Sequence, residues 1–99
     1  MMAKGYWIAH VTVTDPERYK DYVAANAAPL GKFNAKFLTR GGAWEPRQTD
    51  MPYDRHVVIE FESYADAKAC YDSPEYQAAS VIRNEASDGY VVVVEGYDG

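Results

Sequence analysis

Three arginines have positions in the sequence that favour a binding site for an anion. Arg40 precedes a Gly-Gly pair, Arg55 begins a predicted strand, and Arg83 lies on the inner stripe of a predicted helix. An inward-pointing guanidinium needs an anionic partner, because an unpaired charge is very costly to remove from water. That partner is either a protein carboxylate, such as Glu75 or Glu95, or a ligand carboxylate held in bidentate fashion.

Tyrosines on the predicted helices lie near the same cleft between helices and sheet. They are Tyr19, Tyr22, Tyr71 and Tyr76. With the arginines they would line a pocket that is aromatic and has a cationic end. The residues predicted to bind a ligand are Arg40, Arg55, Tyr22, Tyr71, Tyr76 and Arg83. The alternative is that these residues form structural ion pairs and an ordinary aromatic core.

His10 and Glu60 are the candidates for catalysis. By strand parity they share one sheet face with His56, the other histidine of the chain. A histidine beside a carboxylate can act as a general acid or base, and two histidines with a glutamate can hold a metal. The alternative is a hydrogen-bonded polar patch within a subunit interface. No CxxC or HxxxH spacing occurs, so we expect no metal site.

Two further side chains have a structural and a functional interpretation. Cys70 is the single cysteine and falls on an inner helical stripe, where it is expected to be a small buried hydrophobe rather than a reactive thiol. Trp44 follows the double glycine. It either folds over a ligand as a lid or, as we favour, anchors a partner subunit.

Composition narrows the classes of function. The 99 residues suit a single domain, residues 1–99, and carry a formal charge of −5. An acidic chain whose basic residues are scattered is not expected to bind nucleic acid. No apolar run approaches the ~20 residues that span a membrane. A strand pattern begins so close to the first residue that we expect no signal peptide, and a lone cysteine fits the cytoplasm. Walker-type and GxGxxG motifs are absent, so we expect no nucleotide or other cofactor.

The elements that position these residues follow from periodicity and capping signals. Strands are predicted at 6–14, 33–40, 55–62 and 90–97, with 43–45 as a possible continuation of the second strand after a break or bulge at the double glycine. Helices are predicted from Asp15 to Gly31, from Ser63, and from Ser73 to Gly89. Each begins at a residue that can cap the first turn, and two have proline at the first helical position.

This order of elements predicts an α+β, ferredoxin-like βαββαβ fold, in which one four-stranded antiparallel sheet carries all helices on one face. The other face would expose Tyr6, Ile8, His10, Val58 and one row of the valines at 91–94. A bare apolar sheet face is unusual on a soluble monomer. We therefore expect a homodimer, a dimeric α/β barrel, that pairs two such faces.

Four segments resemble a known bacterial family, the domain of unknown function 1330 of the dimeric α/β-barrel superfamily. They are GYWIAHVTVTDPERYKDYV at 5–23, FLTRGG at 37–42, RHVVIEFESYADAKACYDSPEYQAA at 55–79 and VVVVEG at 91–96. One departure is Glu62, where the family usually has proline; it should alter the strand exit without changing the fold. The resemblance implies a two-fold dimer of ferredoxin-like subunits and no particular activity.

Three classes of function remain open. The first is a small-molecule binder or cofactor-free enzyme, resembling an oxygenase or isomerase, acting on a small carboxylate or aromatic metabolite. His10 or a tyrosine would then serve as its acid or base. The second is a non-catalytic dimeric module for ligand sensing or interaction. The third, a haem-handling protein, needs a histidine beside an apolar pocket, and strand parity places neither histidine there.

Overall fold

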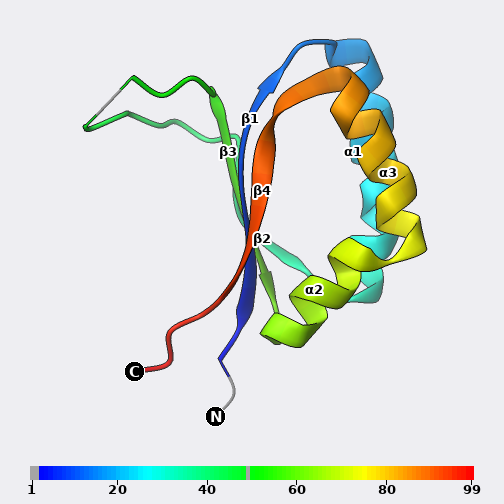
Figure 1. The fold of residues 1–99 in the computed structure, drawn as a ribbon, viewed down its shortest axis with the longest axis vertical. Coiled ribbons are helices and arrows are strands. Elements are labelled where there is room, and N and C mark those ends of the chain that lie inside the picture. The colour runs from blue at the N-terminus through cyan, green and yellow to red at the C-terminus, as the bar shows by residue number, and fades with distance from the viewer. Residues whose placement is uncertain (1–2, 49) are drawn as a thin grey trace.

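A four-stranded antiparallel sheet carries all helices on one face (Figure 1). The computed structural model describes residues 3–48 and 50–99. The elements in chain order are β1 (Gly5–Val13), α1 (Pro16–Lys32), β2 (Lys36–Arg40), β3 (Arg55–Phe61), α2 (Tyr64–Asp72), α3 (Pro74–Ala86) and β4 (Ser87–Glu95). The strands lie in the order β2-β3-β1-β4. The predicted ferredoxin-like plan is therefore confirmed.

The three helices begin at the predicted caps. The side chain of Asp15 accepts a hydrogen bond from the backbone N–H of Arg18, and Ser63 accepts one from that of Asp66. Ser73 ends α2 and also caps α3, where it accepts from the N–H of Tyr76. Because these bonds satisfy first-turn amides that lack helical partners, short polar signals in the sequence fix where the helices start.

The boundary between α3 and β4 differs from the prediction. The helix ends at Ala86 rather than at Gly89, and the strand begins at Ser87 rather than at residue 90. Gly89 has a φ of 144° and pairs with Val11 in the sheet, where a Cβ would collide with the backbone of β1. Glycine is required there by the close approach of two strands, not by a helix stop.

The second strand is shorter than predicted. It begins at Lys36 rather than at residue 33 and ends at Arg40 as predicted, and residues 43–45 form no strand. Its irregularity lies between Phe37 and Thr39 rather than at the double glycine. Gly41 adopts a φ of 73°, a left-handed conformation that turns the chain away from β3 into the loop of residues 41–54.

The core fills the space between the sheet and the helices. Trp7 is 3% exposed and donates a hydrogen bond of 2.8 Å from its indole Nε1 to the carbonyl oxygen of Ala67. Its ring packs against those of Phe61 and Tyr76, with centroid distances of 5.1 and 4.7 Å. These contacts pack β1 against α2 and α3. Trp7 and Tyr76 also line the cavity described below.

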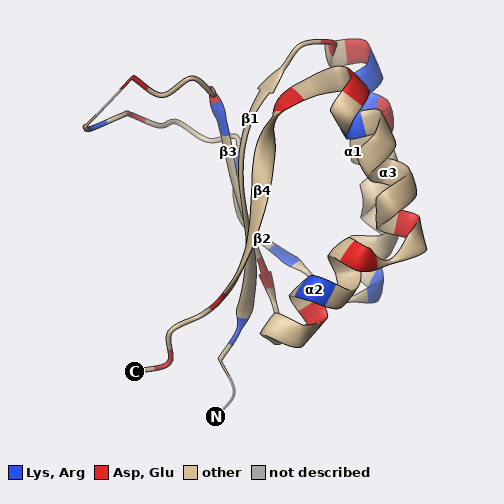
Figure 2. Ribbon diagram, viewed as in Figure 1, with Lys and Arg blue, Asp and Glu red and all other residues tan. Residues whose placement is uncertain are grey.

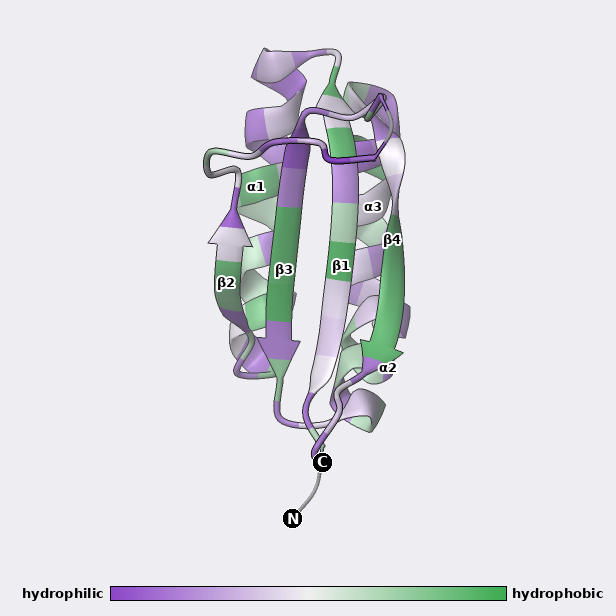
Figure 3. Ribbon diagram, turned by 90° about the vertical axis from the view of Figure 1, so that its left-hand side faces the viewer, coloured by the Kyte–Doolittle hydropathy of each residue, from purple (hydrophilic) through white to green (hydrophobic). Residues whose placement is uncertain are grey.

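The opposite face of the sheet carries no helix (Figure 3). Cross-strand pairs put Ile8 beside Val58 and Val92, so the predicted parity is confirmed. Val92 is 47% exposed on this face. Charged residues are spread over the helices and the ends of the sheet instead of forming one basic stripe (Figure 2). Among the residues that the structure describes, no helix is long and apolar enough to cross a bilayer.

Candidate functional site

A cavity of about 40 Å³ lies between the sheet and helices α1 and α3. Its walls are mostly apolar and aromatic, and its polar groups are guanidinium, hydroxyl and amide groups. The lining residues with chemistry are Tyr19, Tyr22, Asn26, Arg40, Arg55, Tyr76 and Arg83. The cavity reaches the surface at Arg40, whose side chain is exposed. Five of the six predicted ligand-binding residues therefore share one cavity.

The three arginines at the cavity have no carboxylate partner among residues 3–48 and 50–99. By contrast, Arg18 pairs with Asp21 and Glu85, and Arg47 pairs with Glu45. Of the two acids expected as partners of the buried arginines, Glu75 pairs with Lys32 instead, and Glu95 lies on β4 without a described ion pair. The protein thus pairs its outer arginines with acids and leaves three cations facing an apolar cavity.

Aromatic rings hold two of these guanidinium groups. Arg40 lies 4.0 Å from the ring centroid of Phe37, and Arg55 lies 5.7 Å from that of Tyr19. The Nε of Arg55 is buried and has no hydrogen-bond partner. A Cβ at Gly41 would collide with the guanidinium of Arg55, so the glycine turn leaves the room that this side chain occupies. A buried, unpartnered donor of this kind is costly unless something else binds it.

Arg83, Tyr76 and Tyr22 form a continuous chain of hydrogen bonds. The Nη1 of Arg83 donates to the hydroxyl of Tyr76 over 2.8 Å, and the hydroxyls of Tyr76 and Tyr22 are 2.8 Å apart. Burial, with the neighbouring Tyr22 hydroxyl, raises the pKa of Tyr76 well above its ordinary value. Tyr76 therefore keeps its proton at neutral pH and cannot act as a base.

The sixth predicted residue, Tyr71, lies behind the cavity wall. Its ring packs on Trp7 and Tyr76, at centroid distances of 5.5 and 5.1 Å, and it does not line the cavity. Asn26 does line the cavity and is only 6% exposed, yet it was not among the predicted site residues. Its signal in the sequence is a polar side chain on the inner stripe of α1, four residues after Tyr22.

The two histidines lie on the opposite face of the sheet from the cavity. His10 and His56 are cross-strand neighbours whose Nδ1 atoms are 2.8 Å apart. Glu60 is paired with Tyr6 instead, and accepts a hydrogen bond from its hydroxyl over 3.2 Å. The predicted grouping of both histidines with Glu60 does not form, because Glu60 lies four residues along β3 from His56. A role for His10 or Glu60 in catalysis stays a prediction without support from geometry.

Trp44 packs on His56, one of these two histidines. Its ring centroid is 4.6 Å from that of His56, and it is 39% exposed. The described loop residues 41–48 and 50–54 cross the end of the helix-free face in front of the strands (Figure 3). Trp44 is therefore not a lid on the cavity, which opens on the other side of the sheet. Its predicted role as a subunit anchor stays a prediction.

Neither a thiol nor a cluster of metal ligands adds chemistry to the site. Cys70 is fully buried, and burial raises the pKa of its thiol to about 11, so it is the small buried hydrophobe predicted. No group of three or more His, Cys, Asp or Glu side chains in the described part of the chain could hold a metal ion. The cavity itself offers cations and hydrogen-bond donors and has no His, Cys, Asp or Glu in its lining.

Comparison with known proteins identifies a family and a fold. A family model described as a domain of unknown function (DUF1330) matches residues 4–97. No curated protein matches the sequence.

Solved structures with similar folds come from several bacteria. A protein of unknown function from Rhodopseudomonas palustris has a TM-score of 0.75 and 14% identity, over 100% of this chain and 86% of that chain. SnoaB, a cofactor-independent oxygenase from Streptomyces nogalater, has a TM-score of 0.64 and 13% identity, over 98% and 96%. A dimeric ferredoxin-like protein of unknown function from Thermobifida fusca has a TM-score of 0.56 and 20% identity, over 96% and 92%. At these identities the likeness shows the fold alone.

Proposed function

We propose that this chain, which belongs to the DUF1330 family, binds a small organic anion in the cavity between its sheet and its helices. The observation that carries the proposal is the set of three arginines at one apolar cavity with no carboxylate to neutralise them. A ligand carboxylate or enolate supplies the missing charge, and a carboxylate can accept two parallel hydrogen bonds from one guanidinium. The aromatic walls favour a planar or apolar body attached to that anionic group.

The size of the cavity limits the ligand. A volume of about 40 Å³ is well below the ~150 Å³ of a cavity that holds benzene, so an aromatic ring requires the walls to move. The side chain of Arg40 is exposed at the mouth, and long arginine side chains change rotamer easily. Short aliphatic carboxylates therefore need the least rearrangement and are the first probes to test.

A cofactor-free enzyme is the activity that we propose to test after binding. The cavity lining has no His, Cys, Asp or Glu that could act as a general base, and burial raises the pKa of both Tyr19 and Tyr76. Its cations instead lower the pKa of a weakly acidic ligand, so the ligand would lose its proton to solvent water and react as the anion. The similarity in fold to SnoaB, a cofactor-independent oxygenase, supports this class of chemistry.

A non-catalytic sensing module is the alternative function, and the absence of a base from the cavity lining favours it. The two functions predict the same binding but different fates of the ligand. Hydrogen–deuterium exchange next to the carbonyl of 4-oxopentanoate, followed by NMR in D₂O, reports proton transfer. Oxygen uptake with hydroxybenzoates reports oxygenation. Tight binding with neither reaction would support the sensing module.

The binding test compares arginines inside and outside the cavity. Pentanoate and benzoate are titrated calorimetrically into the protein and its variants Arg55→Gln and Arg40→Gln. Each substitution removes a charge-assisted hydrogen bond and should weaken binding by about tenfold. Arg47→Gln is the matched control, because Arg47 pairs with Glu45 away from the cavity. If neither carboxylate binds, or if Arg47→Gln weakens binding as much, the proposal is wrong.

We also propose that the protein works as a homodimer through the helix-free face of its sheet. The exposed row of Tyr90, Val92 and Val94 on β4 supports this arrangement, as does the fold shared with proteins described as dimeric. In such a dimer the cavities stay on the outer, helix-covered side of each sheet. Each subunit would then bind ligand independently.

A further inference from the structure

The hydrogen-bond chain of Arg83, Tyr76 and Tyr22 in the cavity wall has a direction, which follows from which groups can donate. Arg83 can only donate, because a guanidinium has five N–H groups and no acceptor. Its Nη1 donates to the hydroxyl oxygen of Tyr76 over 2.8 Å. The hydroxyl oxygens of Tyr76 and Tyr22 are 2.8 Å apart, and either could donate to the other.

Burial decides which tyrosine is the donor. Tyr76 is 0% exposed, so its hydroxyl proton must find an acceptor within the protein. Arg83 cannot be that acceptor, and the remaining neighbour of the Tyr76 hydroxyl is the oxygen of Tyr22. The reverse arrangement would leave the Tyr76 proton buried without a partner, which costs roughly 1–3 kcal/mol. The chain therefore runs from Arg83 through Tyr76 to Tyr22.

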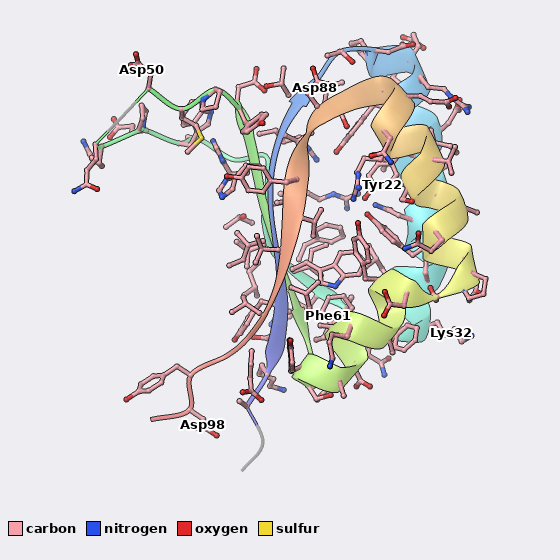
Figure 4. The ribbon with its side chains drawn as sticks, in the orientation of Figure 1. Tyr22, Lys32, Asp50, Phe61, Asp88 and Asp98 are labelled. Carbon is pink, nitrogen blue, oxygen red and sulfur yellow. The ribbon has the colours of Figure 1, made fainter. Side chains whose placement is uncertain are left out.

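The proton of Tyr22 is then free to point into the cavity. Tyr22 is 8% exposed and lines the cavity, and its side chain lies in the space between the helices and the sheet (Figure 4). Asn26 lines the same wall one helical turn further along α1 and is 6% exposed. Residues four apart on a helix share a face, so the side chains of Tyr22 and Asn26 both reach the same cavity.

We propose that Tyr22 and Asn26 donate hydrogen bonds to an uncharged oxygen of the ligand, so that the preferred ligands are oxo acids rather than simple carboxylic acids. This inference rests on the proposed binding of an organic anion. Arg40 and Arg55 hold the carboxylate, and the Tyr22–Asn26 pair holds a carbonyl oxygen elsewhere on the same molecule. Tyr76 and Arg83 act as positioning residues, because they fix the orientation of the Tyr22 hydroxyl without touching that oxygen.

The chemistry of the chain suits a carbonyl oxygen. Each hydrogen bond in a chain polarises the next, so the cation of Arg83 makes the Tyr22 proton a stronger donor. Such a donor binds a carbonyl and binds an enolate oxygen more strongly still. A methylene at the same position would leave the hydroxyl and the amide unpaired in an apolar cavity, which disfavours the simple acid.

The test compares ligands that differ only in one carbonyl. Pentanoate, 2-oxopentanoate and 4-oxopentanoate have the same chain length and carboxylate, and each is titrated calorimetrically into the protein. At least one oxo acid should bind about three- to tenfold more tightly than pentanoate, the effect of one or two net hydrogen bonds. In Tyr22→Phe the ratio of oxo-acid to pentanoate affinity should fall clearly below that of the wild type, because only Asn26 is left to donate to the carbonyl oxygen. Tyr97→Phe, at a position that is 95% exposed, is the matched control.

Two further variants keep the test decisive. Asn26→Leu should also reduce the preference, and it replaces Tyr22→Phe if that variant does not fold. Tyr76→Phe should reduce the ratio of oxo-acid to pentanoate affinity, which a merely structural role would not change. If pentanoate binds but no oxo acid is preferred, or if the preference is undiminished in Tyr22→Phe, the inference is wrong and the proposed function stands. If no acid binds at all, both are wrong.

Discussion

The imidazole of His10 makes the stability of the fold depend on pH. Burial lowers the pKa of His10 below its ordinary value of 6.5, and the neighbouring His56 lowers it further. The folded state therefore binds a proton less readily than the unfolded chain does. The contribution of His10 to the free energy of unfolding is fully present above about pH 6.5, the pKa of histidine in the unfolded chain. It is lost as the pH falls from there through the lower pKa of His10 in the folded state, because the unfolded chain takes up the proton first.

This dependence can be isolated with a neutral replacement. In His10→Asn the melting temperature should fall less between pH 7.5 and 5.5 than in the wild type, measured by differential scanning fluorimetry. The carboxylates of the two proteins are the same, so their titration cancels in the comparison. Equal slopes in the two proteins would show that His10 does not titrate on unfolding.

Tyr76 is the residue whose hydroxyl contributes most to the buried polar network. Tyr76→Phe removes the acceptor of Arg83 and the partner of Tyr22 at once. Leaving such groups unpaired costs roughly 1–3 kcal/mol of unfolding free energy. Urea denaturation should show this loss in Tyr76→Phe and none in Tyr97→Phe. If Tyr76→Phe leaves the free energy of unfolding unchanged, the network contributes nothing to stability.

Gly41, in the turn after β2, serves two purposes: it adopts a left-handed backbone conformation, and it leaves room for the side chain of Arg55 at the site. Gly41 has a φ of 73°, and a Cβ there would meet the guanidinium of Arg55, whereas a Cβ at Gly42 would meet nothing within 4 Å. Gly41→Ala should therefore cost ~1–2 kcal/mol of stability through its left-handed backbone and also displace Arg55, which weakens carboxylate binding.

The adjacent glycine gives the control. Gly42→Ala should leave both the urea midpoint and the calorimetric affinity for pentanoate unchanged. Loss of stability without loss of affinity in Gly41→Ala would show that Arg55 adjusts to the new methyl group. Equal effects of the two substitutions would contradict the role given to Gly41.

The elements were predictable where a local signal decides them. Caps such as Ser73 act within four residues, and strand parity in β1 and β3 follows from the alternation of apolar side chains. Gly89 was misread because glycine is common after helices, whereas its cause is the approach of β1, which the sequence does not display. Contacts between elements that are distant in the chain could not be predicted, because the sequence does not display which elements lie side by side.

The site was predictable to the same extent. Arg55 and Arg83 were found because charged residues at inward positions are rare and need partners, and Arg40 was found because it precedes the Gly-Gly pair. Asn26 was missed because a single polar residue on an inner stripe is common in structural roles. Periodicity gives the face of a helix that a residue occupies but not its neighbours, which is why Tyr71 was expected at the cavity and lies behind it.

At the scale of the whole molecule, the helix-free sheet face decides the assembly. Four strands about 4.8 Å apart and roughly 25 Å long give a face of roughly 500 Å², mostly apolar along β1 and β4. Patches of this size on soluble proteins mark interaction sites. A second copy can cover the face by two-fold symmetry, with the same residues on both sides of the contact. Light scattering should then give twice the 11.1 kDa mass of one chain.

A charge placed on this face should break the dimer, whereas the same charge elsewhere should not. Val92 is 47% exposed on β4 within the face, and Val81 is 57% exposed on α3. In a dimer, Val92→Asp buries an unpaired carboxylate twice, once in each subunit, so it should give monomers or aggregates at micromolar concentration. Val81→Asp should remain dimeric, because the helices do not take part in the proposed contact. A wild-type particle of 11.1 kDa would exclude the dimer. A dimer that survives Val92→Asp and dissociates in Val81→Asp would place the contact on the helices instead.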